Sequence, residues 1–478
     1  MPDWIPESLA KILRETPALS RAYLVGGCVR DWLLGRSNKD FDIEVFGIDE
    51  EQLIAALRPW GRTDLVGRSF GVIKLTTRAG ETFDFSLPRR DSKIARGHKG
   101  FSVIVDPEIA PRDAAARRDF TINALMFDPR TSEVLDFFGG QEDLRQRRLR
   151  HTGAAFVEDP LRVLRGMQFA GRFDLTAAPE TIALCRSIKH TYVELAVERV
   201  REEWFKWAQK STVPSRGLRF LVETGWVEHF PEIAALTGTP QDPEWHPEGD
   251  VFTHTGHCLD ALVTLPAFQE ANDTMRVIYA LAVLAHDFAK PATTREELRD
   301  GRLRIISPGH EAAGGPLAEQ FLQRMATPNA IRERILPLVT NHLAHLQAIT
   351  DRAVRRLAKR LEPATIDDLA VIITADQFGR PPRPRVPSEN LILLQHKAAE
   401  LQVQFSAPKP ILLGRHLMEL GMRPGPEFGQ ILDAAFDAQL EGSFLDLPKA
   451  WNWLGEQKST ALPETVLAAL RSKLAEKN

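Results

Sequence analysis

The sequence predicts an α+β protein in which a small mixed head precedes a long, all-helical body. Two observations predict this division. Residues 1–150 alternate short β-like runs with helical stretches, whereas amphipathic helical patterns follow one another almost without interruption from about residue 151. The alternation indicates a sheet covered by helices, and the unbroken succession indicates helices packed on helices.

Length, composition and charge set broad limits on the protein. A chain of 478 residues is long enough for several domains. Its 43% hydrophobic and 26% charged residues are typical of globular proteins. The net charge of −3 gives no overall sign of nucleic-acid binding, so any RNA contact must come from local basic clusters. No apolar run approaches the roughly 18 to 20 residues of a membrane span.

Cysteine usage and the first residues indicate the compartment. Three cysteines, Cys28, Cys185 and Cys258, are odd in number and far apart, which argues against a disulfide framework. The opening residues MPDWIPESLAKILRE carry Asp, Pro and Glu where a signal peptide has basic and then apolar residues. We therefore expect a cytoplasmic protein.

Composition shifts divide the helical body. The Pro/Gly/Asp-rich stretch 238–250 marks a junction, and the stiff proline-rich stretch RPPRPRVP marks a second one. We expect four domains, which are the head, a helical neck, a second helical domain and a helical tail. Their expected bounds are 1–150, 151–245, 246–380 and 381–478.

Acidic residues alternate along an expected strand in the head. In DFDIEVF, Asp40, Asp42 and Glu44 point to one face, and the apolar residues between them point to the core. Carboxylates this close repel one another unless a divalent cation lies between them. An ordinary solvated strand face explains the same alternation. Asp84, in the expected strand TFDFSL, supplies a third carboxylate if the two strands are neighbours.

A glycine pair precedes these acids. Gly26 and Gly27 end an apolar run and begin a helical segment that contains Arg30. Backbone N–H groups at such a start, with no side chains in the way, can approach the phosphates of a nucleotide. A plain tight turn explains the glycine pair alone. Its spacing to Arg30 and to the two aspartates favours a phosphate site.

Together these motifs resemble class II tRNA nucleotidyltransferases and bacterial poly(A) polymerases of the polymerase-beta-type superfamily. The stretch LVGGCVRDWLLGRSNKDFDIEV is similar to the signature of that family. The resemblance implies a nucleotidyltransferase head over residues 1–150 and a nucleotide-reading, RNA-binding neck over residues 151–245. It continues through GRSFGVIKL, PRRDSKIARGHKGF, RRDFTINALMFD, LDFFGGQEDL and EDPLRVLRGMQFAGRF, over the first third of the chain.

The resemblance implies phosphoryl transfer assisted by two Mg²⁺ ions, with Asp40 and Asp42 as their ligands and Asp84 as a further catalytic carboxylate. In RRDFTIN, a helix start with Asp119 as its N-cap and buried apolar residues Phe120, Ile122, Leu125 and Met126 is the structural alternative. The implied nucleotide-binding residues of the head and neck are Gly26, Gly27, Arg30, Arg117, Arg118, Asp119, Asn123, Asp159, Arg162 and Arg165.

Asp159 and Arg162 carry the expected choice of base. Cytosine and adenine present an amino donor beside a ring-nitrogen acceptor, and uracil and guanine present the reverse. A carboxylate and an arginine three residues apart on a helix face complement the first pattern. The same residues fit a helix start with Asp159 as N-cap and Pro160 at N1. One carboxylate oxygen can cap the helix while the other reads a base.

The basic, glycine-containing segment 88–112 fits a disordered connection or a functional loop. In the resembling family such a loop serves the final addition of A, so its presence favours a complete CCA-adding enzyme. Poly(A) polymerases of the family also carry a loop, and they remain an alternative.

Histidines and aspartates recur through the second helical domain. A His-Asp pair ends an apolar helix, where two polar groups are costly without a ligand. Any one histidine fits a core or surface position, but the ordered set resembles HD-family phosphohydrolases and implies a divalent metal of unknown identity. His257 lies one turn from His254, and we choose His254 as the first ligand. The set is His254, His286, Asp287, His310, His342 and Asp376.

We therefore expect an enzyme that adds C, C and A to the 3′ end of tRNA from CTP and ATP, with a second phosphohydrolase activity. The alternatives are a poly(A) polymerase, a nucleotidyltransferase that performs only the CC or the A step, and a non-catalytic RNA-binding protein. No obligate protein partner is evident. The basic clusters 145–150, 353–361 and 380–385 are candidate phosphate contacts or solvated faces, and the first of them is the best candidate for the tRNA acceptor stem. The tail turn at Arg423 fits either a tRNA contact or a plain helix-turn-helix packing.

Overall fold

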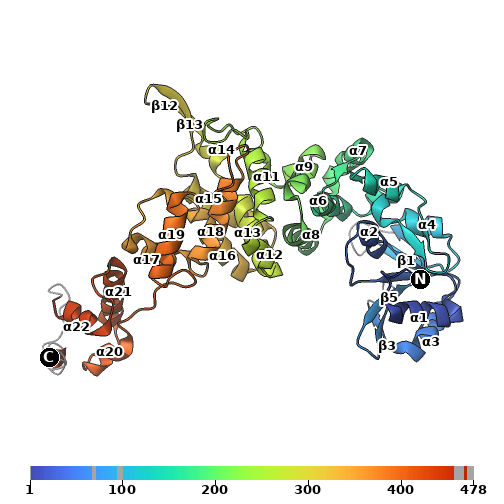
Figure 1. The fold of residues 1–478 in the computed structure, drawn as a ribbon, viewed down its shortest axis with the longest axis horizontal. Coiled ribbons are helices and arrows are strands. Elements are labelled where there is room, and N and C mark those ends of the chain that lie inside the picture. Colours follow the sequence, from blue (N-terminus) through green and yellow to red (C-terminus); the bar gives the residue numbers. More distant parts are fainter. Residues whose placement is uncertain (1, 67–70, 94–100, 457–467, 471–478) are drawn as a thin grey trace. The chain divides into compact units, whose positions relative to one another are not determined.

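The computed structural model describes residues 2–66, 71–93, 101–456 and 468–470. It forms two compact units, one of Met1–Ala234 with Arg324–Ala326, the other of Ala235–Gln323 with Thr327–Asn478. Figure 1 shows a sheet with helices in the first unit and mainly helices in the second. The predicted α+β class, with its mixed head and helical body, is confirmed. The division into four domains stays a prediction.

A seven-stranded sheet forms the centre of the head, in the order β3-β4-β5-β2-β1-β8-β9. β1 lies antiparallel to β2 and β8, whereas β2 and β5 are parallel. The register of that parallel pair sets Asp42 directly opposite Asp84. The strands are β1 (Ala22–Val25), β2 (Asp42–Val45), β3 (Gly61–Val66), β4 (Val72–Thr77), β5 (Thr82–Ser86), β8 (Met126–Asp128) and β9 (Glu133–Leu135).

Alternation explains why the two central strands hold acids at one face and a core at the other. Ile43 and Val45 in β2, and Phe83 and Phe85 in β5, are buried. The head also contains three helices between or before these strands, α1 (Glu7–Glu15), α2 (Gly27–Leu33) and α3 (Glu50–Leu57). The start of α3 is fixed by a capping box between Asp49 and Gln52.

Three segments of the head and neck differ from the sequence prediction. Residues 88–112 contain a hairpin, β6 (Arg89–Lys93) with β7 (Phe101–Val105), and the helix α4 (Pro111–Ala116), while residues 94–100 lie outside the described part. The α-helix start that was the structural alternative for RRDFTIN does not form, because a single 3-10 turn at Thr121–Asn123 leads into β8. The four apolar residues expected there are buried. A short parallel pair, β10 (Arg148–Leu149) with β11 (Thr176–Ala177), was also not foreseen.

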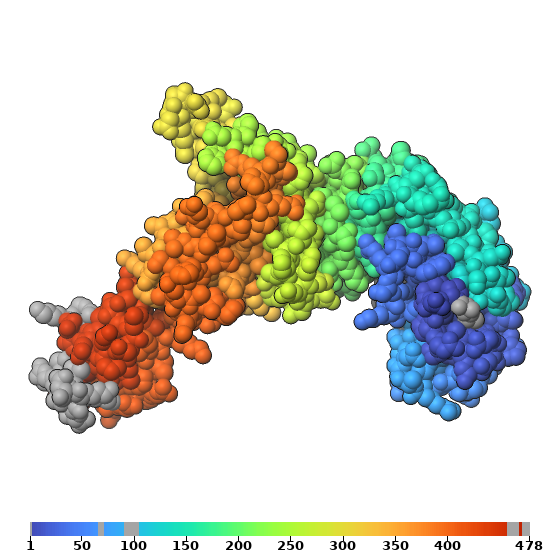
Figure 2. Space-filling view, in the orientation of Figure 1, coloured from blue at the N-terminus to red at the C-terminus, as the bar shows by residue number. Residues whose placement is uncertain are grey.

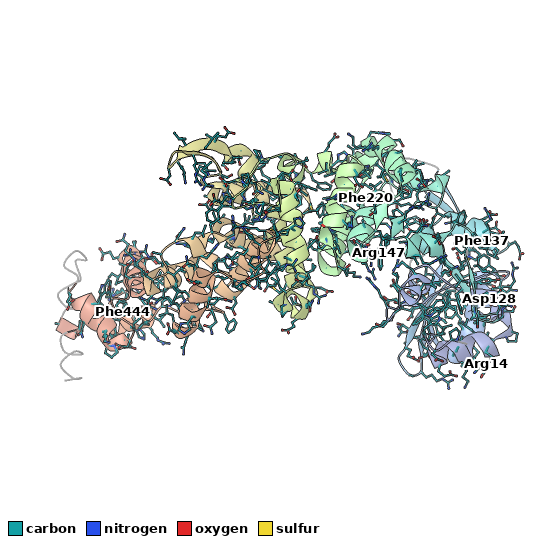
Figure 3. All side chains as sticks on the ribbon, turned by 45° about the horizontal axis from the view of Figure 1, so that its top comes forward. Arg14, Asp128, Phe137, Arg147, Phe220 and Phe444 are labelled. Carbon is teal, nitrogen blue, oxygen red and sulfur yellow. The ribbon has the colours of Figure 1, made fainter. Side chains whose placement is uncertain are left out.

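The neck helices pack closely around two glycines. A Cβ atom on Gly166 of α6 would lie 2.6 Å from the ring of Phe220 in α9, which is labelled in Figure 3. A Cβ atom on Gly217 would lie 2.7 Å from the Met167 carbonyl oxygen. The neck helices are α5 (Gly140–Arg145), α6 (Leu161–Phe173), α7 (Pro179–Ser187), α8 (Val197–Lys210), α9 (Pro214–Glu223) and α10 (Pro231–Leu236).

In the second unit, α11 packs against α18, and α13 packs against α16. A hairpin of β12 (Arg295–Arg299) and β13 (Arg302–Ile306), which the sequence reading missed, extends from these helices in Figure 1. The helices are α11 (Val251–Leu262), α12 (Pro266–Glu270), α13 (Asp273–Ala285), α14 (Lys290–Thr293), α15 (His310–Arg324), α16 (Asn329–Asn341), α17 (Asp351–Leu361), α18 (Ile366–Phe378) and α19 (Glu389–Glu400).

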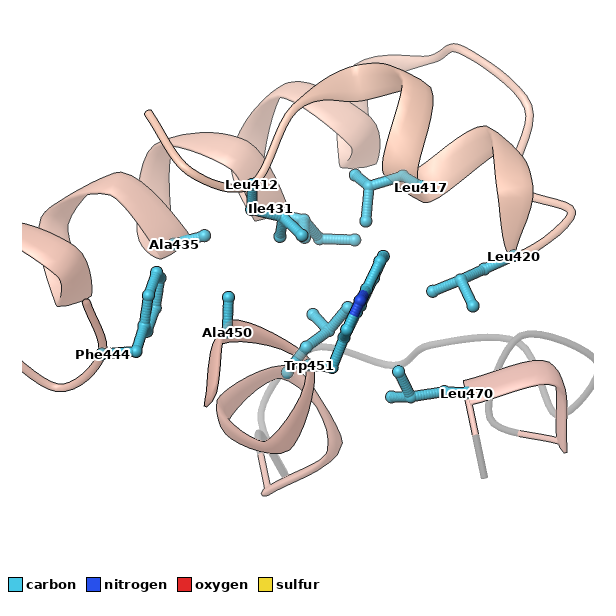
Figure 4. Packing of buried hydrophobic residues seen from close by; sticks show 10 residues of the cluster. Leu412, Leu417, Leu420, Ile431, Ala435, Phe444, Ala450, Trp451 and Leu470 are labelled. Carbon is cyan, nitrogen blue, oxygen red and sulfur yellow. The ribbon is translucent and has the colours of Figure 1, made fainter. Parts of the chain in front are cut away.

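The tail comprises α20 (Gly414–Glu419), α21 (Pro426–Glu441) and α22 (Leu447–Glu456). Its own apolar cluster surrounds Trp451, with Leu417, Ile431 and Phe444 among its members (Figure 4). The tail turn that carries Arg423 is exposed. Within the described ranges, no helix combines the length and apolar character needed to cross a membrane.

The Gly217 contact predicts a loss of stability on substitution. Gly217→Ala lowers the free energy of unfolding by about 1–3 kcal/mol, because the added methyl group overpacks the junction of α6 and α9. Gly429→Ala is the matched control, since Gly429 holds the same position in α21 and has open space where a Cβ atom would lie. It raises stability by about 0.5–1 kcal/mol through helix propensity. Urea unfolding of both variants measures the difference, and equal effects would contradict the packing.

Candidate active site and second polar cluster

A pocket of about 640 Å³ opens in the first unit, where β2 and β5 face the neck. All of the predicted head and neck site residues line it except Asp40. Asp40 is exposed and lies two residues before the first residue of β2, and its N–H donates to the side chain of Asn38 at 3.2 Å. The predicted residues that the pocket brings together are Gly26, Gly27, Arg30, Asp42, Asp84, Arg117, Arg118, Asp119, Asn123, Asp159, Arg162 and Arg165.

Negative charge is concentrated on one wall of the pocket. Burial raises the pKa of Asp42; Arg118 opposes this rise, and the neighbouring carboxylates of Asp84, Asp40 and Glu44 reinforce it. A divalent cation would relieve that repulsion, so the carboxylates fit Mg²⁺. Glu44 is buried and lies 3.6 Å from the guanidinium of Arg118, which makes it a counter-ion and not a third equivalent ligand.

The glycine turn leaves room for an arginine side chain beside its backbone. Gly26 has φ of +72°, and its N–H donates to the Leu125 carbonyl at 3.0 Å. A Cβ atom at this position would lie 2.6 Å from Nη1 of Arg118. Glycine is therefore needed both for the left-handed backbone and for the approach of the guanidinium.

A buried hydrogen-bond chain joins the turn to the neck. Arg30, 4% exposed, donates to the Asn123 side-chain oxygen, and Asn123 Nδ2 donates to Asp119 Oδ1 at 2.9 Å. Arg165 Nε donates to Asp119 Oδ2 at 2.7 Å. Burial alone would raise the pKa of Asp119, but Arg165 and the donors around it lower the pKa below its usual value. Asp119 is therefore a charged structural anchor in the pocket wall, and it does not cap a helix.

Asp159 and Arg162 line the same pocket with separate partners. Asp159 lies before α6 and accepts the Leu161 N–H at 3.1 Å, while Pro160 holds the N-cap position, one residue from the prediction. Its carboxylate pairs with Arg199 of α8 at 2.8 Å. Arg162 donates to the carbonyls of Ala155 and Arg117, both at 2.8 Å. The two side chains thus do not share one helix face.

Arg199 is a pocket residue that the sequence reasoning missed. It stands among many charged residues in VERVREEWFKWAQK, and nothing in that pattern separates it from the exposed face of the helix. Lys206 and Lys210 of the same helix also line the pocket.

The basic cluster 145–150 contributes mainly to internal ion pairs. Arg147 pairs with Asp174, and Arg150 pairs with Asp143 and Glu180. Arg145 pairs with Glu142 within α5. Its role at the tRNA acceptor stem stays a prediction.

The cluster 353–361 is likewise engaged within the second unit. Arg355 donates to the Leu440 carbonyl at 3.1 Å, and Arg356 pairs with Glu441. In the cluster 380–385, Arg380 donates to the Asp376 carboxylate and Arg383 donates to the Glu244 carbonyl. Part of each basic cluster therefore stabilises contacts within the fold.

The second unit contains the other predicted set as one buried cluster. His254 lies on α11, His286 and Asp287 follow α13, and the remaining members come from the start of α15, the end of α16 and α18. His254 Nε2 lies 3.0 Å from Asp376. His310 Nε2 lies 3.2 Å from His342 Nε2 and 3.3 Å from Asp287 Oδ1. We call His254, His286, Asp287, His310, His342 and Asp376 the histidine–aspartate cluster.

The rings of this cluster are oriented by their Nδ1 atoms. Those of His286, His310 and His342 each lie within 2.7 Å of a backbone carbonyl three residues earlier. Nδ1 of His254 lies 2.7 Å from Glu248. A ring nitrogen held by an acceptor carries the proton, so Nε2 is left as the lone-pair donor that faces the cluster. This is the arrangement that metal ligation requires.

Besides a group of His246, Glu248 and His254, the ligand atoms of the cluster fall into two groups that each fit a metal ion. One contains His254, His286 and Asp376 with Cys258, and the other contains Asp287, His310 and His342. Asp287 faces both, since Oδ2 lies 3.1 Å from His286 and Oδ1 faces His310. Within the described part, His286 Nε2 and both Asp287 oxygens lack a hydrogen bond of good geometry although they are buried. Nitrogen and carboxylate donors of this kind suit a divalent transition metal.

His257, the alternative first ligand, is half-buried and belongs to neither of those groups among the described residues.

Several partners of the cluster were missed in the sequence. The side chain of Glu248 is fully buried between His246 and His254, and their hydrogen bonds outweigh burial and lower its pKa to about 2. Lys290 lies 2.8 Å from Asp287, and Arg380 donates to Asp376 at 2.7 Å. Lys290 follows Asp287 by three residues and Arg380 follows Asp376 by four, so helical spacing could have predicted both ion pairs.

Comparisons with known proteins agree with this architecture. Residues 22–150 match the poly A polymerase head domain family. The chain is 36% identical over 428 residues to the multifunctional CCA protein of Xanthomonas campestris pv. campestris (strain B100), covering 87% of this chain and 97% of that relative. It is 38% identical over 368 residues to the multifunctional CCA protein of Halorhodospira halophila, covering 76% and 80% respectively.

Solved structures share the fold. The Bacillus stearothermophilus CCA-adding enzyme in complex with CTP aligns over 100% of both chains, with a TM-score of 0.64 and 21% identity. The Thermotoga maritima CCA-adding enzyme complexed with tRNA aligns over 98% of this chain and 97% of that one, with a TM-score of 0.57 and 19% identity. Given the identity and coverage of its relatives, the chain belongs to the multifunctional CCA protein family of class II tRNA nucleotidyltransferases.

Proposed function

We propose that this protein adds C, C and A to the 3′ end of tRNA from CTP and ATP, with release of pyrophosphate, and that its histidine–aspartate cluster hydrolyses phosphate esters. The observation that carries the first activity is the pocket in which an acidic wall faces a basic one beside a glycine turn. The relatives that match over most of their length carry the CCA name, which favours this function over poly(A) tailing.

The acidic wall supplies the catalytic carboxylates. Asp42 and Asp84 stand side by side across β2 and β5, and Asp40 precedes them in the chain. Asp40 and Asp42 would hold Mg²⁺, which lowers the pKa of the RNA 3′-hydroxyl and neutralises the nucleotide phosphates. The hydroxyl oxygen attacks the α-phosphorus, and the bond to the bridging oxygen of pyrophosphate breaks. The protein contributes chiefly position and charge.

The basic wall binds the triphosphate. Arg118 reaches the open backbone at Gly26, and Arg117 lines the same side of the pocket. Their positive charge attracts the negatively charged phosphates, so the nucleotide lies between the arginines and the carboxylates. Arg30, Asn123 and Asp119 are engaged with one another, and they act by holding this wall in place.

Base choice falls to Asp159 and Arg162. The carboxylate oxygen of Asp159 can accept from the amino group of cytosine or adenine, and Arg162 can donate to the neighbouring ring nitrogen. Arg199 holds the Asp159 carboxylate, and two backbone carbonyls hold the Arg162 guanidinium. Both reading groups are thus positioned before the nucleotide arrives, and uracil or guanine would set donor against donor and acceptor against acceptor.

The histidine–aspartate cluster supports the second activity. Its two groups of ligands would hold one divalent ion each, which would supply a water of lowered pKa and polarise the phosphate ester. The water oxygen adds to phosphorus, the P–O bond to the ribose breaks, and the ribose oxygen takes up the proton. Lys290 and Arg380 lie beside the ligands and favour binding of an anionic substrate.

The acidic wall predicts the effect of Asp42→Asn. Nucleotide addition falls by about a thousandfold, because several kcal/mol of charge stabilisation depend on this carboxylate. Binding of tRNA is unchanged. Glu81→Gln, an exposed acid that precedes β5, is the control with wild-type rates. Single-turnover extension of tRNA that lacks CCA measures both, and wild-type addition by Asp42→Asn would remove the catalytic assignment.

Arg162→Ala tests the choice of base. The ratio of kcat/KM for CTP over UTP falls about tenfold or more, since a good hydrogen-bonding pair contributes about 1–3 kcal/mol of discrimination. Arg58→Ala, an exposed arginine outside the pocket, leaves the ratio unchanged. Sequencing the products with each nucleotide checks the result. An equal loss for all four nucleotides would indicate that Arg162 only supports the two segments it contacts.

The second cluster is tested by His286→Ala. Bound transition metal and phosphohydrolase activity are lost, while nucleotide addition is kept, because the nucleotide pocket contains none of these ligands. His257→Ala is the matched control and keeps metal, hydrolysis and addition. Metal content by mass spectrometry accompanies both assays. Loss of metal in His257→Ala would mean that His254 was the wrong choice of first ligand.

A further inference from the structure

Two buried polar side chains of the neck lack a partner at the wall of the nucleotide pocket. Gln168 of α6 and Glu203 of α8 are each 2% exposed, and both line that pocket. Within the described residues, Gln168 Nε2 and Glu203 Oε2 are buried atoms that form no hydrogen bond. A buried donor or acceptor is costly when it stays unpaired, so this pair calls for a polar ligand in the pocket.

Contacts between α6 and α8 show that the two side chains lie along the same stretch of the groove. Where the helices begin, Asp159 pairs with Arg199 at 2.8 Å. Where they end, a Cβ atom on Gly171 would lie 3.1 Å from the ring of Trp207. The two helices therefore run side by side in the same direction, and the unpaired donor and acceptor both lie between these contacts.

Glu203 is held close to the proposed base reader by two charged neighbours. Its Oε1 accepts from Lys206 Nζ at 2.8 Å, which leaves Oε2 for a ligand. Asp119 raises the pKa of Arg165 most, burial opposes this rise, and the charge of Glu203 adds to it. Gln168 follows Arg165 by three residues, so these two side chains share one face of α6. The unpaired donor therefore lies one helical turn beyond the arginine whose charge Glu203 feels.

Positive side chains continue the pocket beyond this pair. Arg172 of α6 and Lys206 and Lys210 of α8 line it. Arg172 also lies 3.6 Å from Asp31 of α2, and in Figure 2 the teal and green residues of the neck adjoin the blue residues of the head. Such cations suit the phosphates of an RNA strand that enters the pocket between head and neck.

We propose that Gln168 and Glu203 bind the 3′-terminal base of the growing RNA and select cytosine over uracil there. The inference rests on the CCA addition proposed above and deepens it. A carboxylate beside a donor repeats the chemistry of Asp159 and Arg162, and Gln168 lies six residues beyond Arg162, which is about 9 Å along the helix axis. The cytosine amino group donates to Glu203 Oε2, and Gln168 Nε2 donates to the ring nitrogen, whereas uracil presents the reverse pattern.

The test uses the full-length protein and two tRNAs that lack the last two nucleotides and differ only in the 3′-terminal base, C or U. Single-turnover addition from CTP is measured on each at subsaturating RNA. The wild-type protein extends the C-ended RNA about tenfold faster, as one hydrogen-bonded pair allows. Gln168→Met removes the amide at similar volume and brings the ratio of the two rates close to one. Glu203→Gln also lowers the ratio, because its amide can donate to the uracil carbonyl.

Glu198→Gln is the matched control, since Glu198 is an exposed acid of α8 outside the pocket, and it keeps the wild-type ratio. The kcat/KM ratio for incoming CTP over UTP is measured in parallel and stays at the wild-type value in all variants, because it depends on Asp159 and Arg162. Loss of that selectivity, or a ratio for the two RNAs that neither Gln168→Met nor Glu203→Gln changes, would overturn the terminal-base site and leave CCA addition standing. A wild-type protein that extends neither RNA would overturn CCA addition and this site with it.

Discussion

The ion pair between the buried Asp119 and the partly exposed Arg165 is the interaction on which the first unit depends. Removing the Asp119 carboxylate from water is costly, and Arg165 offsets that cost together with hydrogen bonds from Asn123 and the Phe120 N–H. Asp119 belongs to the segment that leads into the sheet, and Arg165 belongs to α6 of the neck. The pair therefore links the segment before β8 to α6, the helix whose start carries the proposed base-reading residues Asp159 and Arg162.

The two polar sites stabilise their clustered charges in different ways. In the nucleotide pocket, carboxylates and arginines face each other across open space, so a ligand of mixed charge fits between them. In the histidine–aspartate cluster the donors are buried, and Nδ1 is fixed by a backbone carbonyl in His286, His310 and His342 and by the Glu248 carboxylate in His254. The first arrangement suits a substrate that enters and leaves at every step of addition. The second suits ions that stay bound.

Local patterns predicted much of this, and the failures lie where distant residues meet. The alternation of polar and apolar residues in β2 and β5 could be predicted from the sequence. The register that places Asp42 opposite Asp84 could not, because it depends on how the strands pair across the sheet. The order of histidines along the chain indicated a cluster, whereas the orientation of each ring depends on its helix end. Arg199 could not be recognised as the partner of Asp159, because its helix is charged along its length. The hairpin β12–β13 was missed since its strands are rich in Arg and Glu and resemble a solvated segment.

The backbone carbonyls that hold Arg162 have a consequence for how the enzyme tolerates mutation. The acceptors belong to the main chain at Ala155 and Arg117, so every side chain that preserves the local backbone leaves them in place. Replacement of either side chain thus leaves both acceptors of the Arg162 guanidinium in place, whereas a side-chain acceptor would be lost by a single substitution. The support of the Arg162 guanidinium is therefore insulated from substitutions at Ala155 and Arg117, whereas the support of the Asp159 carboxylate depends on the side chain of Arg199.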